Sequence, residues 1–236
     1  MSNLKIYYAP GIFNVNGKFI GDDILVRQSD VIEKSNVYMQ CPVAFHKYNR
    51  TFIGYAPSDV EINIDKKERL IITTDGWENK ITCEQEYFDS PNLTIQFYCP
   101  RYLFWTEEEN VWLEFNDHPM TSYKNNCIAI NGWFNLSNWP RCSNFAVTIV
   151  DVDKPIVIKK GDPLFRLTFH SNDLNKGIIL TKETNNEIID AAWKKSISNK
   201  DEMTEITKGK NHIPYLSSVL FSKTDKKCPF RFLFSE

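Results

Sequence analysis

The side chains best suited to hold a ligand lie in one short aromatic segment near the middle of the chain. They are two indoles, an amide and a guanidinium, carried by Trp133, Asn135, Trp139 and Arg141. Flat aromatic faces, amides and a guanidinium are the groups that hold a planar or anionic ligand. The same spacing also fits a structural role, in which Gly132 permits a bend and the two indoles cover the end of a sheet. Two interpretations therefore stand, a ligand pocket or a cap on the core.

A second group of polar side chains follows the Cys41-Pro42 dipeptide. It consists of His46, Tyr48 and Arg50, which we expect in one loop. An imidazole, a phenol and a guanidinium in one loop predict a secondary ligand-binding position. The alternative is a surface loop that Val43 and Phe45 anchor to the core.

Catalytic patterns are missing from the sequence. The four histidines are scattered without an H-x-H pair, and His118 beside Asp117 is the least weak metal candidate. No dinucleotide-binding, Walker, nucleophile-elbow or HExxH motif occurs. We therefore predict no catalytic residue, no metal and no cofactor, which favours a protein that is not an enzyme.

Composition and cysteine usage narrow the class of protein. The six cysteines form no C-x-x-C pair, and no signal peptide or run of about 20 apolar residues occurs. A net charge of −2 gives no field that would recruit nucleic acid. The sequence predicts a cytosolic protein with reduced thiols, no membrane association and no strong nucleic-acid signal.

The elements that must position these side chains are mostly strands. Between Ser143 and Ser171, polar and apolar residues alternate in three runs, and two turns separate these runs. We therefore predict a compact antiparallel meander. A hairpin is predicted from the runs 60–64 and 70–74. In it, Ile62 and Ile64 should face Leu70 and Ile72.

The chain changes character after about residue 175. Thr184 and Glu187 have the spacing of a capping box, in which the threonine hydroxyl accepts from the Glu187 amide, and helical periodicity follows until a stop near Gly209. A second short helix is expected near Pro214. We predict one mainly β domain over 1–236, an antiparallel β-sandwich, jelly roll or β-clip-like fold. It divides into a β-rich body (1–175) and a helical C-terminal element (176–236).

The run from Pro155 to Leu167, with its Lys-Gly-Asp turn, resembles the last strands of the β-clip fold of dUTPases and dCTP deaminases. This resemblance implies nucleotide binding. Two positions depart from the family pattern. Asn135 stands where a dUTPase motif has an aspartate, and Thr148 and Ile149 stand where the deaminase has its glutamate. Asn135 can hold a nucleoside but cannot act as a carboxylate base.

Three further pieces of the chain are similar to a family of tailed-phage and bacterial proteins of unknown function. They are Cys41-Pro42-Val43 with the following aromatic-rich loop and strand, the segment 132–141, and the segment 160–165. The resemblance implies a phage origin, and hence the cytoplasm of an infected host cell or the virion. It transfers no catalytic residue.

Three functions follow from these patterns. The first is a non-enzymatic phage-type binding or assembly protein, which self-associates or docks a protein partner through aromatic-rich loops. The second is a small-ligand or nucleotide-binding or sequestering protein that uses the Trp133–Arg141 segment. The third is a metal-dependent or nucleotide-hydrolysing enzyme of cupin or β-clip type.

Overall fold

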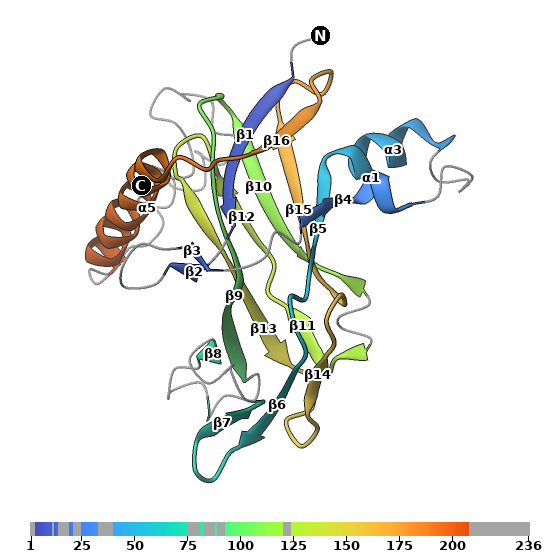
Figure 1. Ribbon diagram of the computed structural model, residues 1–236, viewed down its shortest axis with the longest axis vertical. Helices are drawn as coiled ribbons and strands as arrows, with labels where there is room; N and C mark the ends of the chain where they lie inside the picture. Colours follow the sequence, from blue (N-terminus) through green and yellow to red (C-terminus); the bar gives the residue numbers. More distant parts are fainter. Residues whose placement is uncertain are drawn as a thin grey trace, which may run out of the picture.

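The computed structural model describes residues 3–10, 12–13, 19–20, 25–32, 40–74, 81–82, 88, 93–119 and 124–207. The chain is mainly β, with several antiparallel sheets and a C-terminal helix, as the sequence predicted (Figure 1). The strands are β1 (Leu4–Pro10), β2 (Ile12–Phe13), β3 (Phe19–Ile20), β4 (Leu25–Arg27), β5 (Thr51–Tyr55), β6 (Val60–Asp65), β7 (Leu70–Thr73), β8 (Ile81–Thr82), β9 (Thr94–Trp105), β10 (Val111–Asp117), β11 (Cys127–Ala129), β12 (Gly132–Asn135), β13 (Arg141–Ile149), β14 (Ile156–Ile158), β15 (Pro163–Ser171) and β16 (Ile178–Lys182). The helices are α1 (Gln28–Val31), α3 (Pro42–Asn49) and α5 (Asn186–Thr207).

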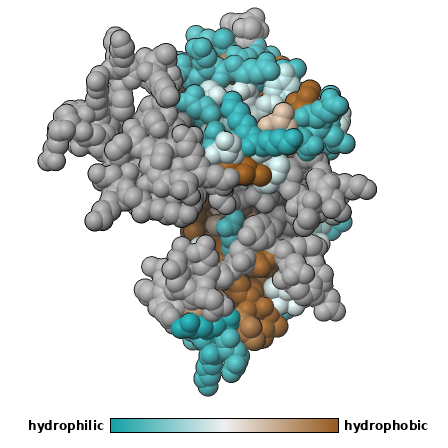
Figure 2. Space-filling model, turned by 90° about the vertical axis from the view of Figure 1, so that its left-hand side faces the viewer, coloured by the Kyte–Doolittle hydropathy of each residue, from teal (hydrophilic) through white to brown (hydrophobic). Residues whose placement is uncertain are grey.

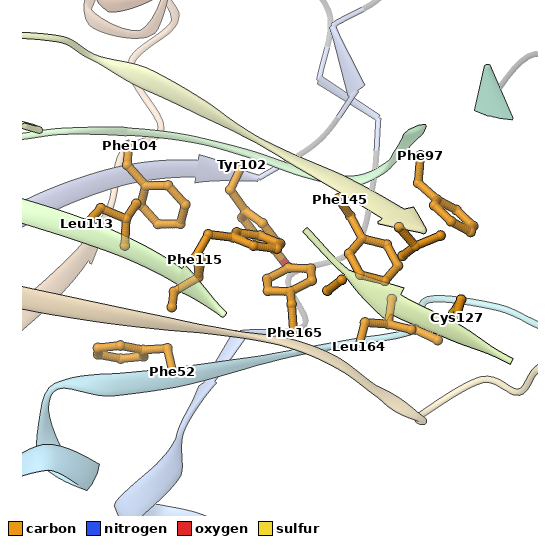
Figure 3. Packing of buried hydrophobic residues seen from close by; sticks show 14 of the residues in the cluster. Phe52, Phe97, Tyr102, Phe104, Leu113, Phe115, Cys127, Phe145, Leu164 and Phe165 are labelled. Carbon is orange, nitrogen blue, oxygen red and sulfur yellow. The ribbon is translucent and has the colours of Figure 1, made fainter. Parts of the chain in front are cut away.

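Two large sheets face each other across an aromatic core. The six-stranded sheet has the order β11-β13-β9-β1-β16, with β8 added to β9, and the five-stranded sheet has the order β12-β10-β15-β5-β4. Phenylalanines from both sheets meet between them (Figure 3). The ring centroids of Phe145 and Phe165 are 5.5 Å apart, and those of Phe104 and Phe169 are 5.8 Å apart. Tilted and edge-to-face aromatic pairs of this kind add to the stability that burial provides.

Strand β10 illustrates how alternation assigns each residue to a face. Val111, Leu113 and Phe115 are buried in the core, whereas Trp112 and Glu114 point away from it and are only partly covered. Successive side chains of a strand point to opposite faces, so an apolar residue at every second position creates one buried face. The outer face of the five-stranded sheet is thereby left to polar and aromatic side chains.

The predicted three-stranded meander is wrong in its pairing. Its three runs form strands, but β13 pairs with β9 and β11, β14 pairs with β6, and β15 pairs with β10 and β5. Each run thus belongs to a different sheet. Alternation identifies a strand with a buried face, but in a sandwich consecutive strands often cross to another sheet, and nothing in the alternation names the partner strand.

The β6–β7 hairpin forms, with a register that differs from the predicted one. Ile62 pairs with Thr73 and Ile64 with Ile71, so Leu70 and Ile72 lie on the opposite face and are 54% and 53% exposed. A shift of one residue turns every side chain of a strand to the other face. In Figure 2 the lower tip of the molecule, where this hairpin ends, is hydrophilic, and an apolar surface lies directly above it.

The C-terminal part begins with a strand before its helix. Strand β16 pairs in parallel with β1, and α5 follows from Asn186. The predicted capping box is wrong, because the side chain of Asn185 accepts the backbone N–H of Glu187 at 3.0 Å in place of the Thr184 hydroxyl. The predicted stop at Gly209 and the second helix near Pro214 lie outside the described residues.

Helix α5 lies against the outside of the six-stranded sheet (Figure 1). Its Ile189 and Ala192 are buried against a small apolar cluster from β1, β9 and β13 that is separate from the main core. No helix within the described part of the chain has the length and apolar character needed to cross a bilayer.

Candidate functional site

The segment predicted as a loop around His46 is a helix. Pro42 occupies the first turn of α3, where its missing N–H costs nothing and its fixed φ suits the helix. Val43 is 79% exposed and Phe45 is 45% exposed, so neither side chain anchors the segment as predicted. The helix instead ends directly at β5 and thereby places Arg50 at the edge of the sandwich.

A pocket of about 410 Å³ lies at this edge, where α3 and β4 face β16 and the loop before it. Its lining is mostly polar and basic, with an apolar rim. The lining residues are Asn3, Arg27, His46, Asn49, Arg50, Leu174, Asn175, Lys176, Gly177, Ile178 and Ile179. Two of the three predicted secondary-site residues, His46 and Arg50, therefore share this pocket, and Tyr48 is not part of its lining.

Arg50 joins the pocket to the loop after β15. Its side chain is 5% exposed, and its guanidinium donates to Ser171 Oγ at 3.2 Å and to the carbonyl oxygens of Asp173, at 3.1 Å, and Lys176. Burial lowers the pKa of Arg50, and the nearby charge of Asp173 opposes that shift. A guanidinium keeps its charge in proteins, so this pocket has a permanent positive charge in its wall.

Arg27 supplies a second guanidinium and connects the two sheets. Its Nη1 donates to the carbonyl oxygen of Asn49 at 2.6 Å, and its Nη2 donates to that of Ile178, in β16, at 2.9 Å. The guanidinium carbon also lies 5.0 Å from the centre of the Phe52 ring. Within the described residues, neither Arg27 nor Arg50 forms an ion pair with a carboxylate.

His46 adds an unsatisfied nitrogen to the same pocket. Its Nε2 is buried and has no hydrogen-bond partner among the described residues. Buried polar atoms are nearly always paired, so this unpaired nitrogen makes His46 a candidate ligand contact among the pocket residues. Lys176, Asn3 and Asn175 add further polar groups around it, while Leu174 and Ile179 are largely exposed at the rim.

The four residues of the Trp133–Arg141 segment lie in different surroundings, and none of them lines the pocket described above. Asn135 is buried, and its Oδ1 accepts the backbone N–H groups of Ser137 and Asn138, which makes it part of a turn. Trp139 is 4% exposed, and its Nε1 donates to the carbonyl oxygen of Ser196 in α5 at 3.2 Å. Both side chains therefore have structural contacts.

The other two residues of that segment lie in different surroundings. The guanidinium carbon of Arg141 stacks 4.3 Å above the ring of Trp139. Trp133 is 57% exposed and lies on the outer face of the five-stranded sheet, where its ring is near Trp112 and His170. Of the two indoles, Trp139 is hydrogen-bonded to helix α5 and Trp133 is exposed to solvent.

Among the described residues, no three His, Cys, Asp or Glu side chains gather as a metal site would require. Burial, and the positive charge of Arg166, lower the pKa of His118, while Asp117 opposes that shift. The pocket residues that sequence reasoning missed are Asn3, Arg27 and the segment 174–179. Nothing local distinguishes them, because only the fold brings them beside α3.

No protein-family model matches the chain, and no curated protein matches its sequence. Solved structures of the dUTPase of Staphylococcus bacteriophage 80alpha show a distant likeness. One point mutant has 7% sequence identity and a TM-score of 0.36, over 70% of this chain and 89% of the dUTPase. Another point mutant, with dUpNHpp, has 8% identity and a TM-score of 0.32, over 75% and 86% of the two chains. Likenesses of this size assign neither a family nor an activity to this chain.

Proposed function

We propose that the protein is a non-enzymatic binding protein for a small phosphate-bearing molecule, held in the pocket of Arg27, Arg50 and His46. The observation that carries the proposal is the combination of two arginines without a carboxylate partner and an unpaired imidazole nitrogen in one pocket wall, all within the described part of the chain. The same pocket contains part of the secondary position predicted from the sequence.

The positive charge in the pocket favours an anion. A buried charge is costly because it loses the stabilisation that water gave it, and Arg50 forms no ion pair with the nearby Asp173 carboxylate that would offset this cost in full. Arg50 and Arg27 offset part of this cost through carbonyl and hydroxyl oxygens. A guanidinium has more N–H donors than these bonds use, so both can still donate to a ligand. Phosphate oxygens match the fork of N–H groups in a guanidinium, which makes a phosphate the best-fitting anion.

The size and rim of the pocket suggest more than a bare anion. A volume of about 410 Å³ lies in the range of small-molecule sites. Leu174 and Ile179 are 65% and 45% exposed beside the polar floor, where they can cover an apolar or planar part of a ligand. A phosphate ester with such a body, for example a nucleoside monophosphate, fits both features.

The chemistry of the lining favours binding over turnover. Among the lining residues within the described chain, His46 and Lys176 are the groups that could act as a base or a nucleophile, and no carboxylate, hydroxyl or thiol accompanies them. The basic groups that are present orient and neutralise an anion, which is the task of a binding or sequestering protein.

Isothermal titration calorimetry tests this proposal with inorganic phosphate, pyrophosphate, a nucleoside monophosphate and the unphosphorylated nucleoside. We expect the phosphate-bearing compounds to bind, more weakly at high salt, and the nucleoside alone to bind much less. His46→Gln and Lys176→Ala should each weaken binding by about 10-fold or more, because hydrogen bonds to charged groups contribute about 1.5–3 kcal/mol.

The matched control is Lys195→Ala, which removes the same charge from the exposed surface of α5. This variant should leave the affinity unchanged. The proposal is wrong if no phosphate-bearing compound binds, or if Lys195→Ala weakens binding as much as Lys176→Ala does. The assembly role predicted from the aromatic loops stays a prediction, and light scattering after size exclusion tests it.

A further inference from the structure

A second cluster lies on the outer face of the five-stranded sheet, built from three neighbouring strands. Strand β10 contributes Trp112 and Glu114, β12 contributes Trp133, and β15 contributes His170. The register sets Glu114 opposite Trp133 and Trp112 opposite His170. Side chains of paired residues share a face of the sheet, so the four groups are gathered by the backbone itself.

The rings of the cluster form an open aromatic surface. The Trp133 ring centre is 6.2 Å from that of Trp112, with the planes tilted by 46°, and 5.1 Å from that of His170, with a tilt of 36°. Trp133 is nevertheless 57% exposed. An indole with this exposure on the face of a sheet has a π surface that a ligand can contact.

A carboxylate lies within this surface. Glu114 Oε2 is 2.7 Å from His170 Nε2. Burial raises the pKa of Glu114, but hydrogen bonds from Trp133, His170 and Asn116, together with the charge of a protonated His170, outweigh it and lower the pKa below its usual value. The group therefore carries its negative charge at neutral pH, next to the edge of an exposed indole.

We propose that the cluster of Trp112, Glu114, Trp133 and His170 binds a quaternary ammonium group. The face of an indole is the best aromatic surface for a cation, and a nearby carboxylate adds direct charge complementarity. A neutral apolar ligand would gain nothing from Glu114, and an anion would be repelled by it. The site shares no residue with the phosphate pocket, so this proposal can be tested independently of the function proposed above.

Titration with choline and with its neutral isostere, 3,3-dimethylbutan-1-ol, at about pH 8 isolates the role of charge. The two molecules have nearly the same shape, so we expect choline to bind and the isostere to bind much more weakly. Trp133→Leu should weaken choline binding about three- to thirty-fold, as the loss of a cation–π contact does. Glu114→Gln should also weaken it.

Lys176→Ala serves as the control, since it alters the phosphate pocket alone and should leave choline binding unchanged. Melting curves should show Trp133→Leu to be folded, because its side chain is mostly exposed. Equal binding of the isostere and choline, no binding of choline, an unchanged affinity in Trp133→Leu, or binding of neutral sugars in place of choline would each overturn the proposal.

Discussion

Replacing Trp139 separates the two roles that its sequence context allowed. The structure places its ring in the interior, with Nε1 bonded to the carbonyl oxygen of Ser196 and the Arg141 guanidinium stacked on its face. Removing a buried tryptophan to alanine costs about 3–5 kcal/mol through lost burial and an unfilled cavity. Trp139→Phe keeps most of the ring and removes one hydrogen bond to the Ser196 carbonyl, which lies within α5 and still has its helical backbone donor, for about 0.5–1.5 kcal/mol.

Urea unfolding and thermal melting measure these costs. For a chain of this length 1 kcal/mol shifts the melting temperature by about 2–4 °C, so Trp139→Ala should lower it by roughly 6–20 °C. Hydrogen exchange should also speed up in α5, because the Trp139–Ser196 bond connects this helix to the sheet. The exposed Trp133 is the matched control, and Trp133→Ala should cost less than about 1.5 kcal/mol.

The reasoning is refuted if Trp139→Ala unfolds with nearly the wild-type free energy and loses phosphate binding. That result would make Trp139 a ligand residue, as one interpretation of the sequence held. We expect the opposite pattern, a large loss of stability with phosphate affinity retained at temperatures where the variant is folded.

Two further predictions concern packing and thiol reactivity. A methyl group on Gly54 would lie 2.3 Å from Cζ of the buried Phe165, so Gly54→Ala should lower the free energy of urea unfolding by about 1–3 kcal/mol. The control is Gly132→Ala, whose added methyl group meets no atom within 4 Å and should change this free energy little. Equal effects of the two substitutions would contradict the tight packing of Gly54 against Phe165. Hydrogen bonds from two backbone N–H groups of α3 lower the pKa of the exposed Cys41, whereas burial and the charge of a nearby aspartate raise that of Cys127 to about 12. Since the thiolate is the nucleophile, iodoacetamide at neutral pH should label Cys41 far faster than Cys127, as peptide mass spectrometry reports; comparable rates at the two would refute the assignment.

The fold class was predictable because alternation is a local property. Each run between Ser143 and Ser171 is a strand, and the charged turn 65–68 does close a hairpin. Pairing was not predictable, because alternation specifies a buried face and leaves the partner strand open. The alternation of Ile156 and Ile158 fits two placements equally well, the central strand of a meander or a strand that pairs with β6. The structure has the second.

The candidate site was predictable only in part. His46 and Arg50 stand close together in the sequence and carry obvious chemistry, so both were selected. Arg27 reaches the carbonyl oxygen of Ile178, 151 residues later, and no short pattern indicates such a contact. The ligand role of the aromatic segment stays a prediction. Its residues are close in the sequence, but alternation and the turn at Asn135 place Trp133 and Trp139 in different surroundings.

The most direct test of the central claim is the response of the His46 side chain to phosphate. In protein with ¹⁵N-labelled histidine, the His46→Gln variant assigns the His46 imidazole resonances. Because Nε2 has no partner within the described residues, saturating phosphate should shift this resonance strongly and leave that of His170, which is bonded to Glu114, nearly unchanged. If phosphate leaves the His46 resonance in place, the pocket does not bind the anion through this residue and the proposed function is contradicted.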